Sequence, residues 1–198
     1  MNLPFSPAAD RNKEHILGCL KELVTDEDKA VLEVGSGTGQ HGVYFSSKLP
    51  GVRWIFSDLM ENHSVIRAYI KNSGPSNLEG PLKYEIGVDK FPVKDIDLVF
   101  TANTFHIMSW KQVKTFIKEL GKCLVPGNRF LVYGPFNYNG EYTSVSNEEF
   151  DTMLKQRDPK SGIRNFEEVK KQLDDKGFRL LKDYEMPANN RLLAFMKI

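Results

Sequence analysis

Several features that would mark a particular class of protein are missing from these 198 residues. The chain has two cysteines, Cys19 and Cys123, which are too few for a disulfide framework, and both fall on apolar faces of expected helices. We expect buried thiols there, with a disulfide or a metal pair as the alternative. No apolar run reaches the roughly 18 residues of a membrane span, and residues 1–13 hold no apolar stretch of the secretory type. We therefore expect a cytoplasmic protein that engages no membrane.

The chain also lacks an excess of positive or negative charge. The 27 Lys and Arg residues nearly balance the 26 Asp and Glu residues and are interspersed with them. The one-sided basic surface of a nucleic-acid binder is therefore not expected, so nucleic acid is not an obligatory partner. We also expect no metal. The 40% hydrophobic content is ordinary for a globular protein, and the length suits one domain over residues 1–198.

Short β-branched runs alternate with helical patterns along most of the chain, which indicates an α/β fold. The expected strands are 30–34, 52–57, 82–86, 96–101, 129–133, 178–184 and 191–197. The expected helices are 13–24, 40–49, 61–72, one capped by Ser109 with Gln112, and two that begin at Ser146 with Glu149 and at Asn165 with Glu168. Residues 186–190 are too few for a helical crossover, so the last two strands must pair antiparallel. We predict a doubly wound, seven-stranded, mostly parallel sheet that ends in an antiparallel hairpin.

Three glycines follow the first strand and open the next helix, in the run V-L-E-V-G-S-G-T-G over 31–39. Glycine there allows a tight turn and lets a ligand approach the backbone, and the helix start offers free N–H groups. A dinucleotide fingerprint needs a glycine at position 40, where this chain has Gln40. A phosphate-binding loop of the Lys-Ser/Thr type is absent too, because His41 follows. Asp58 lies about 20 residues on, where an acid binds a ribose, although it could instead cap the next helix.

The run resembles motif I of the class I S-adenosylmethionine-dependent methyltransferases, which have a Rossmann-like fold. That resemblance implies S-adenosyl-L-methionine as cofactor, with Glu33 at its aminocarboxypropyl end. Asp89 matches the place where related enzymes hold the adenine amino group, although a solvated turn is an equal alternative. The residues we expect to contact the cofactor are Glu33, Gly35, Ser36, Gly37, Gly39, Asp58, Leu59, Val88, Asp89 and Asn103, with Arg11 and Asn12 from the polar segment 6–13. That segment is either a frayed tail or a lid over the cofactor.

The fourth expected strand ends in T-A-N-T-F-H over 101–106, at the edge of the sheet where ligands of open α/β proteins bind. The run has no Asn-Pro-Pro-aromatic motif, so the chemistry of the adenine and glutamine methyltransferases is not assigned. His106 is a candidate base for the methyl acceptor, and a structural histidine is the alternative. Tyr133, at the end of the fifth expected strand, and Phe136, just beyond it, would line the acceptor pocket.

Segments spread over essentially the whole chain resemble the DUF938 (UPF0585) family of methyltransferase-like proteins, among them 6–13, 106–110, 143–151 and 186–190. The resemblance implies one methyltransferase domain and no particular substrate. It suggests an acceptor-side site lined by Arg11, Asn12, His106, Asn147, Arg157, Arg164 and Asn190, with turn and salt-bridge roles as an equal alternative for some of them. We expect transfer to a small molecule. The alternatives are a non-catalytic cofactor-binding module that acts through a protein partner, and an NAD-dependent reductase, which Gln40 and the hairpin disfavour.

Overall fold

The computed structural model describes residues 3–198, which form two compact units divided after Thr101. The fold is α/β, with a seven-stranded, mostly parallel sheet whose C-terminal strands are antiparallel, as the sequence predicts. No helix within residues 3–198 combines the length and the apolar character needed to cross a membrane.

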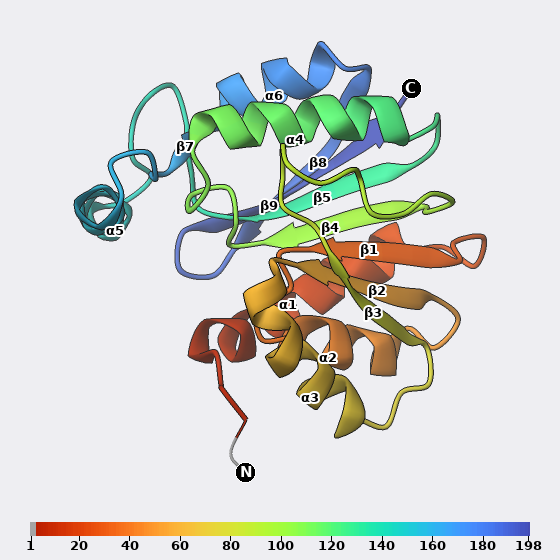
Figure 1. Ribbon diagram of the computed structural model, residues 1–198. Coiled ribbons are helices and arrows are strands. Elements are labelled where there is room, and N and C mark those ends of the chain that lie inside the picture. The colour runs from red at the N-terminus through yellow and green to blue at the C-terminus, as the bar shows by residue number, and fades with distance from the viewer. Residues whose placement is uncertain (1–2) are drawn as a thin grey trace. The chain divides into compact units, whose positions relative to one another are not determined.

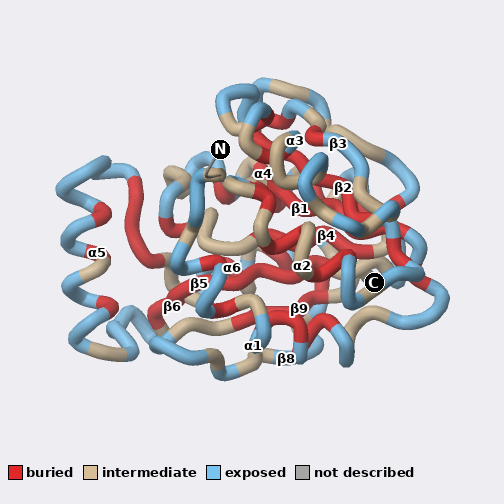
Figure 2. The backbone as a smooth tube through the Cα atoms, turned by 90° about the horizontal axis from the view of Figure 1, so that it is seen from below, coloured by how far each residue is buried: buried red, intermediate tan, exposed pale blue. Residues whose placement is uncertain are grey.

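The first unit contains helix α1 (Pro7–Leu23), strand β1 (Ala30–Val34), helix α2 (Gln40–Lys48), strand β2 (Arg53–Asp58), the short 3-10 helix η1 (Met60–Asn62), helix α3 (His63–Lys71), strand β3 (Leu78–Lys83) and strand β4 (Leu98–Ala102). Its strands lie in the order β3-β2-β1-β4 and are parallel. Figure 1 shows α1, α2 and α3 gathered on one side of β1, β2 and β3. Strand β1 is buried along its whole length, Glu33 included, as the apolar residues around it predict (Figure 2).

The second unit contains helix α4 (Trp110–Cys123), strands β5 (Arg129–Gly134) and β6 (Phe136–Asn137), helix α5 (Val145–Arg157), strand β7 (Arg164–Asn165), helix α6 (Phe166–Asp174) and strands β8 (Phe178–Met186) and β9 (Asn190–Lys197). Strand β9 pairs antiparallel with both β5 and β8, which confirms the predicted hairpin. Helices α4 and α6 lie together beside these strands (Figure 1). The predicted capping box of α4 is present, with Ser109 and Gln112 bonded reciprocally.

Three element boundaries were predicted wrongly. Helix α1 begins six residues earlier than residue 13, at Pro7, because the Ser6 hydroxyl accepts a hydrogen bond from the Ala9 N–H. Helix α5 is capped by Ser144 through the Asn147 N–H, rather than by Ser146. Strand β3 spans 78–83 instead of 82–86, and Gly80-Pro81 lies inside it. An edge strand tolerates this dipeptide, since one side of the strand needs no N–H donors.

The two cysteines differ from the expectation in one respect. Cys19 is buried in α1, but Cys123 is exposed, because it is the last residue of α4 and lies beyond the buried stripe that ends at Leu120. Neither cysteine forms a disulfide within the described chain.

Candidate functional site

The loop between β1 and α2 has the backbone conformation that its glycines predict. Gly35, Gly37 and Gly39 have φ angles of 72°, 58° and 84°, in the left-handed region that other residues resist. A Cβ atom added at Gly37 would meet nothing within 4 Å, so the loop surface is open there. No side chain caps the start of α2 at Gly39, which leaves its first turn available to a ligand.

Asp58 fixes this loop from the end of β2. Its Oδ2 accepts a hydrogen bond from the Gly37 N–H at 2.6 Å, and its Oδ1 accepts from the Leu59 N–H at 2.7 Å and from the Asn62 amide at 2.8 Å. The side chain is buried, yet a carboxylate has about four acceptor positions, so a hydroxyl donor fits as well. The ribose role stays a prediction, and the structure adds that Asp58 shapes the glycine loop.

Glu33 lies near the end of β1 and is 2% exposed. Its Oε2 accepts a hydrogen bond from Trp54 Nε1 at 3.0 Å. Burial raises the pKa of Glu33 to about 8, an effect that the hydrogen bonds from Trp54 and Ser36 oppose and that the negative charge of Asp58 reinforces. The sequence reasoning singled out Glu33 but missed Trp54.

The segment 6–13 is not a frayed tail, because it forms the start of α1 and packs on the start of α2. The Ser6 N–H donates to Gln40 Oε1 at 2.6 Å, and Asn12 Oδ1 lies 2.6 Å from His41 Nε2. Burial lowers the pKa of His41 to about 4. The side chain of Asn12 is thus engaged with His41, whereas Arg11 is exposed on α1. Their contact with a cofactor stays a prediction, as does the lid.

The residues predicted to surround adenine combine exposed apolar groups with a closed turn. Leu59 is 39% exposed and Val88 is 70% exposed, which leaves apolar surface for a flat ring to cover. Asp89 Oδ2 accepts from the Glu85 N–H at 2.9 Å, and its Oδ1 contacts Lys83 Nζ at 3.0 Å. These contacts lower the pKa of Asp89 and match the turn that the sequence left as the alternative.

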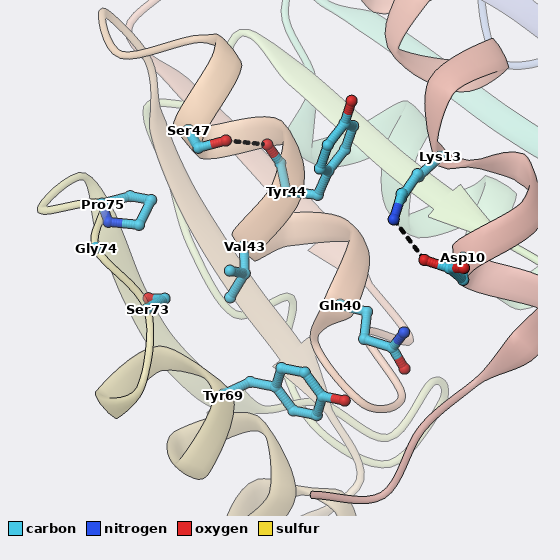
Figure 3. Close-up of a pocket in the computed structure, with 10 residues that line it drawn as sticks. All are labelled: Asp10, Lys13, Gln40, Val43, Tyr44, Ser47, Tyr69, Ser73, Gly74 and Pro75. Atoms are coloured by element: carbon cyan, nitrogen blue, oxygen red, sulfur yellow. Dashed lines mark hydrogen bonds and ion pairs between the residues drawn. The ribbon is translucent and has the colours of Figure 1, made fainter.

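A groove of about 350 Å³ lies on the outer side of α2, between α1 and α3 (Figure 3). Val43, Tyr44 and Ser47 form its α2 side, with Tyr69 on α3 opposite and Asp10 and Lys13 on α1. Gly42 lies on the other face of the same helix, against Trp54 and Phe56. The groove therefore lies on a different face of α2 from the one that packs on the sheet. Gln40, which directly follows the glycine loop, is one of the residues that line the groove.

In the second unit, the predicted base His106 is buried against an aromatic ring. The side chain is 5% exposed and meets the Phe150 ring edge-on at 5.2 Å between centroids. Burial, helped by the charge of Arg164, lowers the pKa of His106 to about 4, so the ring is neutral at physiological pH but a weaker base than a free imidazole. Nearby in sequence, Asn103 has a φ of 59° and donates its N–H to the Tyr133 carbonyl at 2.9 Å.

Arg164 holds the loop that carries His106. Its guanidinium donates to the carbonyls of Phe105 at 3.0 Å, of Lys160 at 2.9 Å and of Met108. The Gly162 N–H donates to the carbonyl of His106 at 2.9 Å. The sequence placed Arg164 among residues that line an acceptor site, whereas its donors are used on backbone carbonyls.

The other predicted acceptor residues occupy different environments. Asn147 donates to Thr143 Oγ1 and to the Asn189 carbonyl, and Asn190 donates to the carbonyls of Pro187 and Ala188 in the β8–β9 turn. Arg157 is exposed at the end of α5, and Phe136 is fully buried, with Tyr133 at 3% exposure. The structure brings Asn147 to the hairpin turn, and a shared pocket for these residues stays a prediction. Across residues 3–198, no group of three His, Cys, Asp or Glu side chains could hold a metal ion.

Comparison with known proteins gives one family and many solved structures of the same fold. A sequence model described as "Protein of unknown function (DUF938)" matches residues 3–197. The S-adenosylmethionine-dependent methyltransferase SibL is 20% identical over 96% of this chain and 55% of its own, with a TM-score of 0.80. An O-methyltransferase family 2 protein of Planctomyces limnophilus, solved with apigenin, is 16% identical over 96% of this chain and 58% of its own, with a TM-score of 0.82.

Human N-acetylserotonin methyltransferase, solved with S-adenosylmethionine, is 15% identical over 96% of this chain and 58% of its own, with a TM-score of 0.74. The chain therefore spans little more than half the length of each of these proteins. At such low identity the likeness establishes the class I methyltransferase fold and leaves the activity to be argued from the site.

Proposed function

The chain belongs to the DUF938 family, and we propose that it is an S-adenosylmethionine-dependent methyltransferase that acts on a small molecule. The observation that carries the proposal is the glycine loop between β1 and α2, with three left-handed glycines and two acidic residues beside it, Glu33 near the end of β1 and Asp58 at the end of β2. This arrangement suits an adenosine-type ligand better than a dinucleotide, since Gln40 replaces the third glycine of the dinucleotide motif.

The residues of the first unit fit such a cofactor by their chemistry. Buried Glu33 would hold its ammonium group, the open surface at Gly37 would accommodate its chain and ribose, and Asp58 would accept from the ribose hydroxyls. Leu59 and Val88 offer exposed apolar surface for adenine. Asp89, Asn103, Arg11 and Asn12 remain assigned to the cofactor as part of the proposal, and residues 1–198 are taken as one functional domain.

When bound, the cofactor supplies an electrophilic methyl group on a sulfonium. The protein then has to orient the acceptor and, where the acceptor carries a proton on the attacking atom, remove that proton. We assign the second task to His106, whose ring is neutral at physiological pH. The similar O-methyltransferase family 2 protein was solved in complex with apigenin, a small hydroxylated aromatic molecule, which is the kind of acceptor we propose to test first.

The test is calorimetric titration with S-adenosylmethionine, S-adenosylhomocysteine and NAD. We expect the first two to bind and NAD not to bind. Gly37→Ala, at a left-handed position in the loop, should weaken binding, whereas Gly51→Ala, which also meets open space but has no left-handed φ, should not. Binding of NAD alone would overturn the proposal. Cofactor binding with no methyl consumed across a panel of phenols, amines and thiols would favour the non-catalytic module instead.

A further inference from the structure

Two buried side chains on adjacent strands, Trp54 on β2 and Glu33 on β1, form a polar contact beneath the glycine loop. Trp54 is fully buried and Glu33 is 2% exposed. Trp54 Nε1 donates to Glu33 Oε2 at 3.0 Å. An indole N–H can only donate a hydrogen bond, and it has one hydrogen to donate. Trp54 therefore binds one oxygen of the Glu33 carboxyl and restricts the orientation of that group.

The surrounding residues hold this contact in one arrangement. Gly42 on α2 faces the indole, and a Cβ atom there would lie 2.5 Å from Trp54 Nε1 and 2.2 Å from Phe56 Cε1. The absence of a side chain at Gly42 is therefore what admits the two rings between α2 and the sheet. On the other side, Ser57 Oγ donates to the Glu33 carbonyl at 2.8 Å, so strand β2 holds both the main chain and the side chain of Glu33.

The charged and titratable groups around Glu33 are few. Asp58 at the end of β2 opposes its ionisation, and Ser36 and Trp54 favour it. His41 on α2 packs against Phe100 of β4, and burial keeps it neutral by lowering its pKa to about 4. With the pKa of Glu33 itself at about 8, the carboxyl is largely protonated at neutral pH. A cationic amine pairs with the ionised carboxylate. The protonated carboxyl of Glu33 therefore has to lose its proton when such an amine binds.

We infer that Trp54 is a positioning residue for the cofactor, because its indole holds one oxygen of Glu33 and so fixes the orientation in which the carboxyl meets the ammonium group, and because binding there releases a proton. The inference rests on the proposed function, since it takes the ligand of Glu33 to be the amino-acid end of S-adenosylmethionine. The proton leaves the Glu33 carboxyl for solvent, and an ion pair with the ammonium replaces it. No other bond changes.

The test is calorimetric titration with S-adenosylhomocysteine, which carries the same amino-acid end and is not consumed. Titration at pH 6.5, 7.5 and 8.5, below the pKa of the ligand's own amino group, in buffers of different ionisation enthalpy counts the protons released. We expect the wild type to release close to one proton at pH 6.5 and only a small fraction of one at pH 8.5, with affinity rising over that range. Trp54→Phe should bind about 10-fold more weakly at pH 6.5, because losing the donor raises the pKa of Glu33 by about one unit, and the deficit should shrink at pH 8.5.

Two variants keep this result interpretable. Trp110→Phe changes the other tryptophan, which lies on α4 in the second unit, and should leave the pH dependence as in the wild type. Glu33→Gln keeps the size of the side chain and should abolish proton release whether or not Trp54→Phe folds. An equal loss of affinity by Trp54→Phe at every pH, or no proton release by the wild type, would overturn the inference while cofactor binding itself still stands. Failure of the wild type to bind the ligand at any pH overturns the proposed function instead.

Discussion

The carboxylate of Asp58 accepts a hydrogen bond from the backbone N–H of Gly37 across 2.6 Å, and so ties the end of β2 to the most exposed glycine of the loop after β1. The same carboxylate binds the Leu59 N–H. A residue expected to contact a ribose thus also determines the shape of the loop that the ligand has to approach.

Asp58→Ala should therefore weaken cofactor binding at least 10-fold and lower the free energy of unfolding by about 1–3 kcal/mol, since it leaves N–H groups of the loop without an acceptor. Calorimetry and urea unfolding measure the two effects. Asp97→Ala is the matched control, because Asp97 Oδ2 accepts from the N–H groups of Lys29 and Ala30 at the opposite end of β1. It should lose similar stability and keep its affinity. A loss of affinity in both variants would mean that stability alone explains the result.

Gly42→Ala should destabilise the protein by about 1–3 kcal/mol, because the added methyl group would overlap Trp54 and Phe56 in a packed interior. Gly18→Ala on α1 has nothing within 4 Å of the new Cβ and should stabilise by about 0.5–1 kcal/mol through helix propensity. Urea unfolding of both variants checks the pair. The packing argument fails if Gly42→Ala is as stable as the wild type.

The first unit shows how much of a site can be read from a sequence. The glycines, Glu33 and Asp58 were predicted because they lie in or directly after a recognisable strand, and the glycine loop has the expected left-handed backbone. Gly42 and its neighbours were missed, although a helix glycine three residues after Gly39 is a signal of close helix–strand packing. The partner of Glu33 could not be found, since Trp54 reads as an ordinary core residue and only the strand pairing brings it to the carboxyl.

In the second unit, local sequence patterns predicted some features and could not predict others. The capping box of α4 and the hairpin follow from local spacing and were predicted correctly. The short strands β6 and β7 pair Phe136 with Arg164 across 28 residues and leave no local pattern. Arg164 was assigned to an acceptor site through the family resemblance, but a guanidinium satisfies backbone carbonyls equally well, and only the fold decides between them.

His106→Asn should lower the turnover of an acceptor that loses a proton by about 10²–10⁴-fold, with cofactor affinity unchanged. The pKa of His106 near 4 means that its ring is neutral throughout pH 5.5–9, so this residue should impose no fall in rate across that range. Steady-state kinetics against pH, with calorimetry of the cofactor, measures both. His15→Asn, at an exposed position on α1, is the control. Unchanged turnover by His106→Asn would remove it from the mechanism.

Acidification should destabilise the protein between pH 6.5 and 4. His41 and His106 both have pKa values near 4 in the folded chain, against 6.5 for a free imidazole, so the unfolded state binds more protons in this range. The stability they contribute is fully present above pH 6.5 and is lost as the pH falls towards 4, by about 1–3 kcal/mol for each residue. His41→Gln should flatten the acid side of the curve of unfolding free energy against pH. A curve as steep as that of the wild type would show that His41 is not its source.

Arg164→Lys should lower the free energy of unfolding by about 2–4 kcal/mol, because a lysine cannot span the three carbonyls that the guanidinium reaches. Loosening of the 105–108 loop should also raise the exposure of His106, and its pKa should move up towards 6.5, a shift that imidazole NMR titration detects. Arg157→Lys, at an exposed position at the end of α5, should change stability by no more than about 0.5 kcal/mol. If Arg164 instead binds the acceptor, Arg164→Lys will keep the wild-type stability and the NMR titration of His106, and the Michaelis constant for the acceptor alone will rise.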